Sequence, residues 1–359
     1  KNYLFVDGRY TIQAKNESGK NFKIVSIHKT LPSKLTNNLR IGFDPSLFTK
    51  KKLNTLFNNK TNLIPINKNL IDEIYLEKLP KTKPFFSLDD KIVGENFKSK
   101  KNKVVKILKK YKSDYLFISA PENVAWLLNI RGNDNPNSPI PNCHLIIDKN
   151  KKIFLIASKE KTQKIVTDKK LKSSQVIDSK NFLSLINKLK GNRFIIDDQS
   201  CSVLNERIIK SKFNIIKKND PCYELKSIKN ITEINHMINA HIEDGLALTK
   251  FIFWIKNINK KKITEMRAQN KLEQFRKAGQ NYLYPSFNTI AGSGSNGAIV
   301  HYRASRKSNR IIKKNDIFLC DSGGQYNYGT TDVTRTICFA QQKKSIKNIF
   351  TKVLKGHIA

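Results

Sequence analysis

The sequence predicts a mixed α/β chain of more than one domain. Its 359 residues are too many for one small hydrophobic core and indicate two or three domains. Short apolar runs typical of strands, such as residues 115–120, alternate with segments whose apolar residues recur at helical spacing, such as residues 98–112. These patterns together indicate helices packed against sheets.

The predicted elements follow one another along the chain. Residues 98–112 place Val104, Val105, Ile107 and Leu108 on one side of a helix whose other surface is almost all lysine. Residues 145–147 and 153–156 are two strand-like runs separated by a polar turn, which predicts a hairpin. A long helix is expected from Ile231 onward, and a second one over residues 263–275, opened by Thr264.

Basic residues dominate the composition. The chain has 67 Lys and Arg against 29 Asp and Glu, which gives a formal charge of +38. Such a charge is typical of proteins that bind nucleic acid or acidic membranes. Lysine recurs on nearly every segment and forms no single dense block, so a compositional bias explains it without a specific nucleic-acid partner. We still expect salt-sensitive adhesion to polyanions.

The cysteines indicate neither a disulfide framework nor a thiolate zinc site. There are five, widely spaced and without a CxxC pair. Cys320 and Cys338 lie in apolar runs, and we expect both to be small core residues. No apolar run approaches the roughly 20 residues that a membrane-spanning helix needs. The default expectation is a cytoplasmic protein without a membrane partner.

The stretch 316–339 carries the strongest chemical signal. It contains two strand-like runs with one carboxylate each, Asp321 and Asp332. A carboxylate on a buried strand costs several kcal/mol unless a cation or many donors compensate it. Side-chain alternation lets a hairpin bring both to one site, and oxygen ligands suit Mg, Ca or Mn, with Zn as a further option. The alternative is that Asp321 begins a turn and Asp332 is solvated.

Other histidines and glycines carry weaker signals. His144 is expected to be a structural histidine, and taken alone His301 would be a core histidine as well. Glu233, His236 and His241 share the long helix, where we expect capping and surface roles and no metal. The glycines of residues 292–297 do not have the spacing of a phosphate-binding loop.

The residues 321–336, DSGGQYNYGTTDVTRT, resemble the DSG-x-QY-x-DGTTD-[IV]-TRT signature of Xaa-Pro aminopeptidases of the aminopeptidase P type, which are pita-bread metallopeptidases. Tyr328 departs from the signature, which has Asp there. Looser resemblances to the same family are DGRYTIQA at 7–14, NLIDEIY at 69–75, AWLLNIRG at 125–132 and the run ending in HY at Tyr302.

The resemblance implies a fold and a division into domains. The fold class would be α/β (α+β), with two N-terminal creatinase-like mixed α/β domains followed by a truncated pita-bread catalytic domain. The implied domains are 1–75, the remainder of the first N-terminal domain, 76–220, the second, and 221–359, the beginning of the catalytic domain. A linker with Pro80 and Pro84 would separate the first two. Both native ends are expected to be missing.

The resemblance also implies an activity and its residues. The activity would be metal-dependent hydrolysis of the N-terminal Xaa-Pro bond of proline-containing peptides in the cytoplasm, by a homodimer. Asp321 and Asp332 would be ligands of two divalent metal ions, manganese or, as the alternative, zinc. His301 would be the catalytic pocket histidine that contacts substrate, and Arg9 a remote substrate contact.

In that family the remaining metal ligands are a histidine and two glutamates, which are expected beyond Ala359. The 359 residues alone are therefore expected to be inactive and to bind metal weakly. The alternative function is a non-catalytic pita-bread module that binds polyanions or protein partners. The basic charge favours this alternative, whereas the presence of both Asp321 and Asp332 counts against it.

Overall fold

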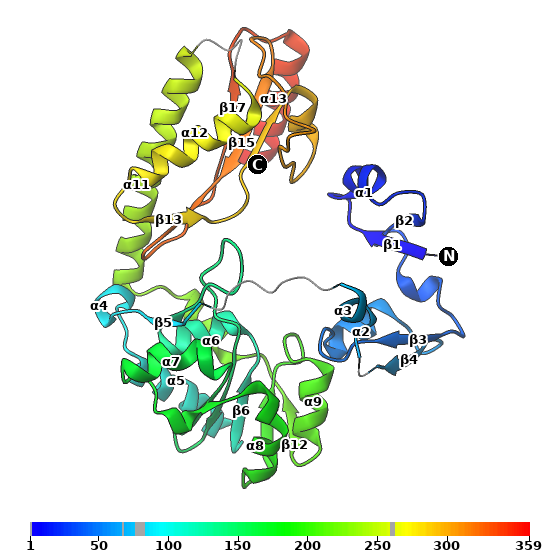
Figure 1. Cartoon of the computed structure of the whole chain (residues 1–359), viewed down its shortest axis with the longest axis vertical. Helices are drawn as coiled ribbons and strands as arrows, with labels where there is room; N and C mark the ends of the chain where they lie inside the picture. Colours follow the sequence, from blue (N-terminus) through cyan, green and yellow to red (C-terminus); the bar gives the residue numbers. More distant parts are fainter. Residues whose placement is uncertain (1, 67, 76–82, 259–262) are drawn as a thin grey trace. The chain divides into compact units, whose positions relative to one another are not determined.

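The computed structural model describes residues 2–66, 68–75, 83–258 and 263–359 (Figure 1). The chain divides into two compact units, one of residues 25–234 and one of residues 1–24 together with 235–359. The predicted domain boundaries after residues 75 and 220 stay a prediction. Most of the predicted linker, including Pro80, lies outside the described residues.

The unit of residues 25–234 is built on a six-stranded mixed sheet with the order β10-β9-β8-β6-β11-β12. The strand β8 runs antiparallel to both of its neighbours, whereas the outer pairs are parallel. The predicted hairpin and the strand at 115–120 are confirmed as β8, β9 and β6. The strands are β6 (Tyr115–Ile118), β8 (His144–Asp148), β9 (Ile153–Ile156), β10 (Val176–Ile177), β11 (Arg193–Ile196) and β12 (Asn214–Lys217).

Both faces of this sheet are covered, as the near-continuous apolar strands require. Successive residues of one strand enter different cores: Leu116 packs in one hydrophobic cluster and Phe117 in the other. The helices around these cores are α5 (Phe97–Lys110), α6 (Pro121–Leu128), α7 (Lys159–Thr167), α8 (Phe182–Lys188), α9 (Val203–Lys210) and α10 (Pro221–Ser227). The predicted helix at 98–112 is confirmed as α5.

Shorter elements complete this unit. Parallel strands β3 (Arg40–Phe43) and β4 (Asn62–Pro65) form a small sheet, and β5 (Phe86–Ser87) pairs with β7 (Ile130–Arg131). The accompanying helices are α2 (Lys50–Leu56), α3 (Leu70–Ile74) and α4 (Asp90–Val93).

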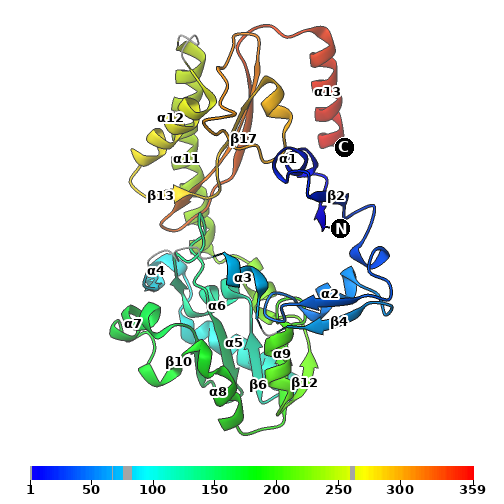
Figure 2. The same cartoon turned by 45° about the vertical axis from the view of Figure 1, so that its right-hand side comes forward.

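The other unit contains an antiparallel sheet with the order β14-β15-β17. Two long helices, α11 and α12, pack on one face of it, and Figure 2 shows both helices beside the sheet. The buried contacts join Phe251 of α11 and Leu272 of α12 to Phe318 of β15. The elements are α11 (Ile231–Asn257), α12 (Glu265–Lys277), β14 (Ile290–Ser293), β15 (Ile317–Ser322) and β17 (Val333–Cys338).

The remaining elements belong to this unit, except that β2 ends in Val25 and Ser26 of the other unit. They are β1 (Asn2–Val6), α1 (Thr11–Glu17), β2 (Phe22–Ser26), β13 (Tyr282–Pro285), β16 (Gly324–Tyr326) and α13 (Lys344–Ile358). The strands β1 and β2 pair, and β13 pairs antiparallel with β16. The expectation that both cysteines of 316–339 are core residues holds for Cys320, which is buried, and is wrong for Cys338, which is exposed.

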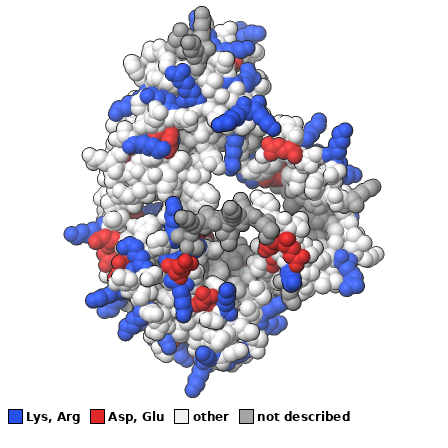
Figure 3. Space-filling view, in the orientation of Figure 1, with Lys and Arg blue, Asp and Glu red and all other residues white. Residues whose placement is uncertain are grey.

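The two long helices confirm the predicted periodicity, but the apolar residues that mark α11 are not its buried face. Ile238 is 52% exposed and Ile242 66%, whereas Ala240, Ala247 and Phe251 are buried. No helix within the described part of the chain is long and apolar enough to cross a bilayer. Figure 3 shows Lys and Arg scattered over the face in view with acidic residues between them, in keeping with an even spread of charge.

Candidate active site

Asp321 and Asp332 lie on the same face of the antiparallel sheet. Asp321 is in β15, where it pairs with Ile290 of β14 on one side and Thr334 of β17 on the other. Asp332 directly precedes β17 and is two residues from Thr334, so side-chain alternation turns it to the face that Asp321 occupies. The alternative is wrong in making Asp321 begin a turn, because this residue is paired on both sides, but Asp332 is exposed as the alternative has it.

The glycine after this strand allows the chain to hold both carboxylates in place. A Cβ atom on Gly323 would lie 1.9 Å from the carbonyl oxygen of Thr331 and 2.3 Å from Ser286 Oγ. Ser286 Oγ in turn donates to the Thr331 carbonyl at 2.8 Å. No other residue fits at position 323, and the close approach fixes the end of β15 against the residue before Asp332.

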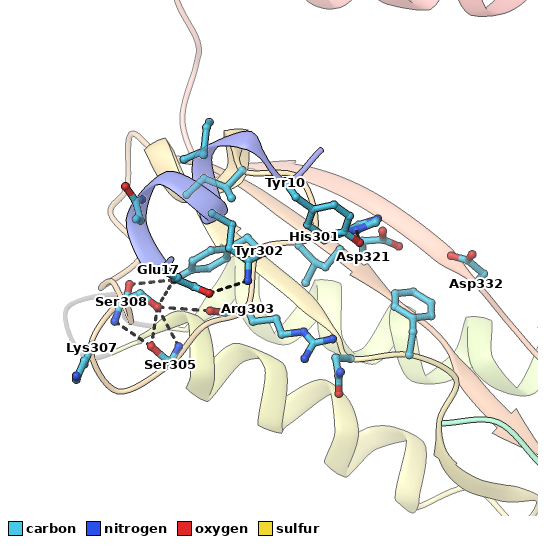
Figure 4. A pocket seen from close by; sticks show the side chains of 17 residues that line it. Tyr10, Glu17, His301, Tyr302, Arg303, Ser305, Lys307, Ser308, Asp321 and Asp332 are labelled. Carbon is cyan, nitrogen blue, oxygen red and sulfur yellow. Dashed lines mark hydrogen bonds between the residues drawn. The ribbon is translucent and has the colours of Figure 1, made fainter. Parts of the chain in front are cut away.

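The two carboxylates line a cavity of about 900 Å³ on the face of the sheet opposite the helices (Figure 4). The cavity lies within one unit, between α1, the strand β14 and the loop that follows it. Its lining combines acidic, basic and apolar side chains, among them Tyr10, Glu17, Phe287, Ile290, Ile299, His301, Arg303, Lys307, Asp321 and Asp332.

One oxygen of this pair is buried without a partner. Asp321 Oδ1 is inaccessible to water and has no hydrogen-bond partner among the described residues. A buried carboxylate oxygen without a donor is costly, and a bound cation would remove that cost. Two carboxylates in one cavity are hard oxygen donors that suit a divalent ion such as Mn²⁺. Within the described residues, no group of three or more His, Cys, Asp or Glu could complete such a site.

His301 lines the same cavity and has an unusual backbone. Its φ is +56°, in the left-handed region that residues other than glycine seldom occupy. Its ring nitrogen Nδ1 is 2.8 Å from the hydroxyl of Tyr10, and the two rings lie 5.4 Å apart. Figure 4 shows Tyr10 and His301 at the end of the cavity where Asp321 lies. The imidazole is exposed and is therefore no core histidine.

A buried carboxylate holds the loop that carries His301. Glu265, in the first turn of α12, is fully buried and accepts hydrogen bonds from the backbone N–H groups of Ser293 and Arg310 at 2.7 and 3.0 Å. It also accepts from Asn296 Nδ2 and from the hydroxyl of Tyr302, the residue after His301. The loop is thereby fastened at both ends and next to the strained residue, which keeps His301 in its position.

A second buried carboxylate ties β15 to the helices. Asp244 of α11 pairs with Arg276 of α12 at 2.7 Å, and Arg276 Nη2 donates to Ser322 Oγ at 3.1 Å. Tyr326 also donates to Asp244. Burial alone would lower the pKa of Arg276, but hydrogen bonding and attraction to Asp244 outweigh it, and the pKa is raised. Ser322 directly follows Asp321, so this network fixes the strand behind the carboxylate.

Arg9 is not brought into the cavity. Its guanidinium makes a two-pronged pair with the carboxylate of Asp7, at 3.1 and 2.8 Å, and its side chain is 58% exposed. The guanidinium also lies 5.6 Å from the centre of the Tyr10 ring. Tyr10 itself was not predicted as a site residue. The only sequence signal for this turn was the DGRY motif at residues 7–10, and the residue predicted from it was Arg9.

His144 is a structural histidine, as predicted, whereas His236 is half-buried and its Nε2 has no partner among the described residues, so the expected surface role is wrong for it. His144 Nδ1 contacts the carbonyl of Ser119 at 2.9 Å, and burial lowers its pKa. Glu233 accepts from the backbone N–H of Asn230, which in turn caps the helix, so its predicted capping role is confirmed. His236 stacks on Tyr328 with ring centres 4.3 Å apart.

The sheets and helices form a creatinase-like α/β domain followed by a pita-bread domain. Residues 77–233 match the creatinase/prolidase N-terminal domain, and residues 235–359 match metallopeptidase family M24. The chain therefore combines a creatinase/prolidase N-terminal domain with a metallopeptidase family M24 domain. The predicted family and fold class are confirmed.

Within that family the chain is similar to Xaa-Pro aminopeptidases. The probable Xaa-Pro aminopeptidase P of Coprinopsis cinerea is 31% identical, and the match covers 100% of this chain and 62% of the relative. The Xaa-Pro aminopeptidase ApepP of Drosophila melanogaster is 33% identical, with 99% and 61% covered.

A solved structure of an X-prolyl aminopeptidase from Caenorhabditis elegans, described as a cytosolic enzyme with a di-nuclear active site, has a TM-score of 0.83 at 26% identity. The match covers 96% of this chain and 60% of that one. The chain therefore spans about six tenths of the length of these relatives.

Proposed function

We propose that the protein is a metal-dependent aminopeptidase that hydrolyses the bond between an N-terminal residue and a following proline. The observation that carries the proposal is the meeting of Asp321, Asp332 and His301 in one cavity, with Asp321 Oδ1 buried and unpartnered. The similarity to Xaa-Pro aminopeptidases along the whole chain supports the reaction class. By the same similarity we propose a cytosolic protein, as for the relative from Caenorhabditis elegans.

Asp321 and Asp332 would hold two divalent ions, for which we propose manganese. When bound, such ions supply an activated water and polarise the scissile carbonyl. The residues of the chain have the remaining tasks. The apolar side chains of Phe287, Ile290 and Ile299 line the cavity and suit a proline ring, whose nitrogen carries no N–H to be satisfied. His301 offers a ring nitrogen that donates a hydrogen bond to the substrate.

Arg9 is proposed as a contact for the distal part of longer peptides. This role requires its guanidinium to leave Asp7. Because the pair is largely exposed, the exchange costs little, about 1 kcal/mol or less. We further propose that the protein acts as a homodimer, and that its three domains divide near residues 75 and 220.

The test is hydrolysis of an Xaa-Pro-Pro peptide by the natural full-length protein, with and without Mn²⁺. Metal-dependent release of the first residue is expected, with loss of at least a hundredfold in an Asp332→Ala variant. The control is Asp168→Ala, which removes an exposed carboxylate that does not line the cavity. A folded protein without turnover would instead favour a binding module, and the charge of +38 makes polyanions its first partners to test.

A further inference from the structure

We propose that Tyr10 is a positioning residue for His301: its hydroxyl donates to Nδ1 and so keeps the imidazole proton on Nε2, facing the cavity. The expected effect on catalysis rests on the proposed function, whereas the control of the His301 tautomer by Tyr10 does not. Three features carry it: the contact itself, the surroundings of Tyr10, and the strain at His301.

The contact indicates which ring nitrogen of His301 accepts a hydrogen bond. Tyr10 Oη lies 2.8 Å from His301 Nδ1, and the described residues offer the phenol no other hydrogen-bond partner. A phenol is a stronger donor than acceptor, and a neutral imidazole has one nitrogen that accepts and one that donates. If Nδ1 accepts from Tyr10, the proton lies on Nε2.

That second nitrogen is available for a ligand. No hydrogen bond to His301 Nε2 is found in the part of the chain that the structure describes, and the imidazole lines the cavity with Asp321. A histidine whose one nitrogen is fixed by a neighbour presents the other in a single protonation form. The N–H at Nε2 is therefore ready to donate to a carbonyl or a leaving nitrogen without prior rearrangement.

The turn around Tyr10 is built to hold the ring. Asp7 accepts from the backbone N–H of Arg9 at 2.9 Å and pairs with its guanidinium. The guanidinium carbon of Arg9 lies 5.6 Å from the centre of the Tyr10 ring, and this cation–π contact helps to hold the ring in place. Asp7, Arg9, Tyr10 and His301 thus form a continuous series of contacts that ends in the cavity.

The backbone of His301 is an independent reason to infer that the position of its ring matters for function. A φ of +56° costs of order 1–3 kcal/mol for a residue with a side chain, and such strain is concentrated at functional sites. Glu265 accepts a hydrogen bond from the side chain of Tyr302, the next residue, but this bond does not restrain the imidazole of His301. The hydroxyl of Tyr10 supplies the missing restraint on the ring.

The first experiment reads the tautomer directly. The full chain is labelled with ¹⁵N-histidine, and His301→Gln identifies the signals of His301 among those of the six histidines. At neutral pH the wild-type chain is expected to show one tautomer with the proton on Nε2. Tyr10→Phe, which removes only the hydroxyl, is expected to give a mixture, whereas Tyr3→Phe in the preceding strand leaves the signals unchanged. Identical His301 signals in wild type and Tyr10→Phe would overturn the proposal.

The second experiment measures hydrolysis of an Xaa-Pro-Pro peptide by the natural full-length protein in the presence of Mn²⁺, with and without the Tyr10→Phe substitution. Tyr10→Phe is expected to lower kcat about tenfold, the loss of one restraining hydrogen bond, with KM changed less than about twofold. Unchanged kcat despite a changed tautomer would refute the positioning role. Absence of turnover in the wild type would reject the proposed function, while the tautomer measurement would still decide whether Tyr10 controls His301.

Discussion

Asp244 of α11 and Arg276 of α12 form an ion pair that is almost completely buried, with 1% of each side chain exposed and Oδ1 and Nε 2.7 Å apart. Its charges are satisfied on both sides, since Tyr326 donates to Asp244 and Arg276 donates to Ser322. The pair joins the two helices to the strand that carries Asp321. Loss of one partner would leave the other charge buried without compensation.

Arg276→Met is therefore expected to lower the free energy of unfolding by about 3–5 kcal/mol. Urea unfolding of the isolated chain, followed by circular dichroism, measures this change. The double variant Asp244→Leu with Arg276→Met should recover much of the loss, because neither charge remains buried. Arg335→Met, at an exposed position of β17, is the matched control and should change stability by less than about 0.5 kcal/mol. A loss below about 1 kcal/mol in Arg276→Met would contradict the structure.

Asp321→Asn should stabilise the metal-free chain by about 1 kcal/mol. The reason is that Asp321 Oδ1 is buried without a donor, so removing the negative charge removes a desolvation cost. Thermal unfolding in the presence of a chelator measures the effect. Asp316→Asn is the control of opposite sign, because Asp316 accepts from Ser293 Oγ at 2.8 Å and from the backbone N–H of Lys313 at 3.0 Å. Destabilisation by both substitutions would show that Asp321 is satisfied in the protein.

Binding of Mn²⁺ to these 359 residues is expected to be weak, with Kd of about 10⁻⁴ M or higher. Asp321 and Asp332 supply two carboxylates, and the described residues provide no cluster of three ligands, whereas Mn²⁺ prefers six oxygen donors. Isothermal titration measures the affinity, and Asp332→Ala should abolish the residual signal. Two tight sites in the isolated chain would disprove this expectation.

Lys100 should make the stability of the chain rise with pH. Its side chain is 1% exposed and donates to Asn129 Oδ1 at 2.8 Å and to the carbonyl of Trp126 at 3.1 Å. Burial lowers its pKa from 10.5 to about 8. Between these two values the unfolded chain binds a proton that the folded chain has released, so the free energy of unfolding increases with pH over this window.

The increase should approach about 1.4 kcal/mol per pH unit in that window, relative to a Lys100→Met variant that has no such proton. Urea unfolding of both proteins between pH 7 and pH 10 gives the difference. The comparison isolates Lys100, because buried thiols such as Cys143, whose pKa burial also raises, affect both proteins alike. In Lys109→Met, on the exposed side of the same helix, the free energy of unfolding should change with pH as it does in the wild type. If the difference in the free energy of unfolding between the wild type and Lys100→Met does not depend on pH, the lowered pKa of Lys100 is contradicted.

The local part of the site could be predicted because side-chain alternation is a property of each strand. The pattern of β15 and β17 was enough to place Asp321 and Asp332 on one face, and the register of Asp321 with Thr334 agrees with it. The contact between Tyr10 and His301 could not be predicted in this way. It joins residues 291 positions apart, and no periodicity of either segment encodes it.

The helices show a similar limit. The isoleucines of α11 recur at helical spacing and predicted the helix correctly, but its buried face is formed largely by Ala240, Ala247 and Phe251, while Ile238 and Ile242 are exposed. Periodicity reports that a helix forms, and only packing against the sheet decides which face is covered. Lys100 was likewise one lysine among many in the sequence, and its burial depends on Trp126 and Asn129 of another segment.

The exposed thiol on β17 offers a reporter that needs no engineering. All five cysteines lie in the described residues, and four of them are buried while Cys338 is accessible. Cys338 pairs with Ile317, and alternation puts it on the strand face that also holds Thr334 and Asp321. A thiol-reactive fluorophore should therefore label the unmodified folded chain once. The fluorophore would be attached to β17, the strand that pairs with the strand of Asp321. Its emission should change when a metal ion or a peptide binds in the cavity.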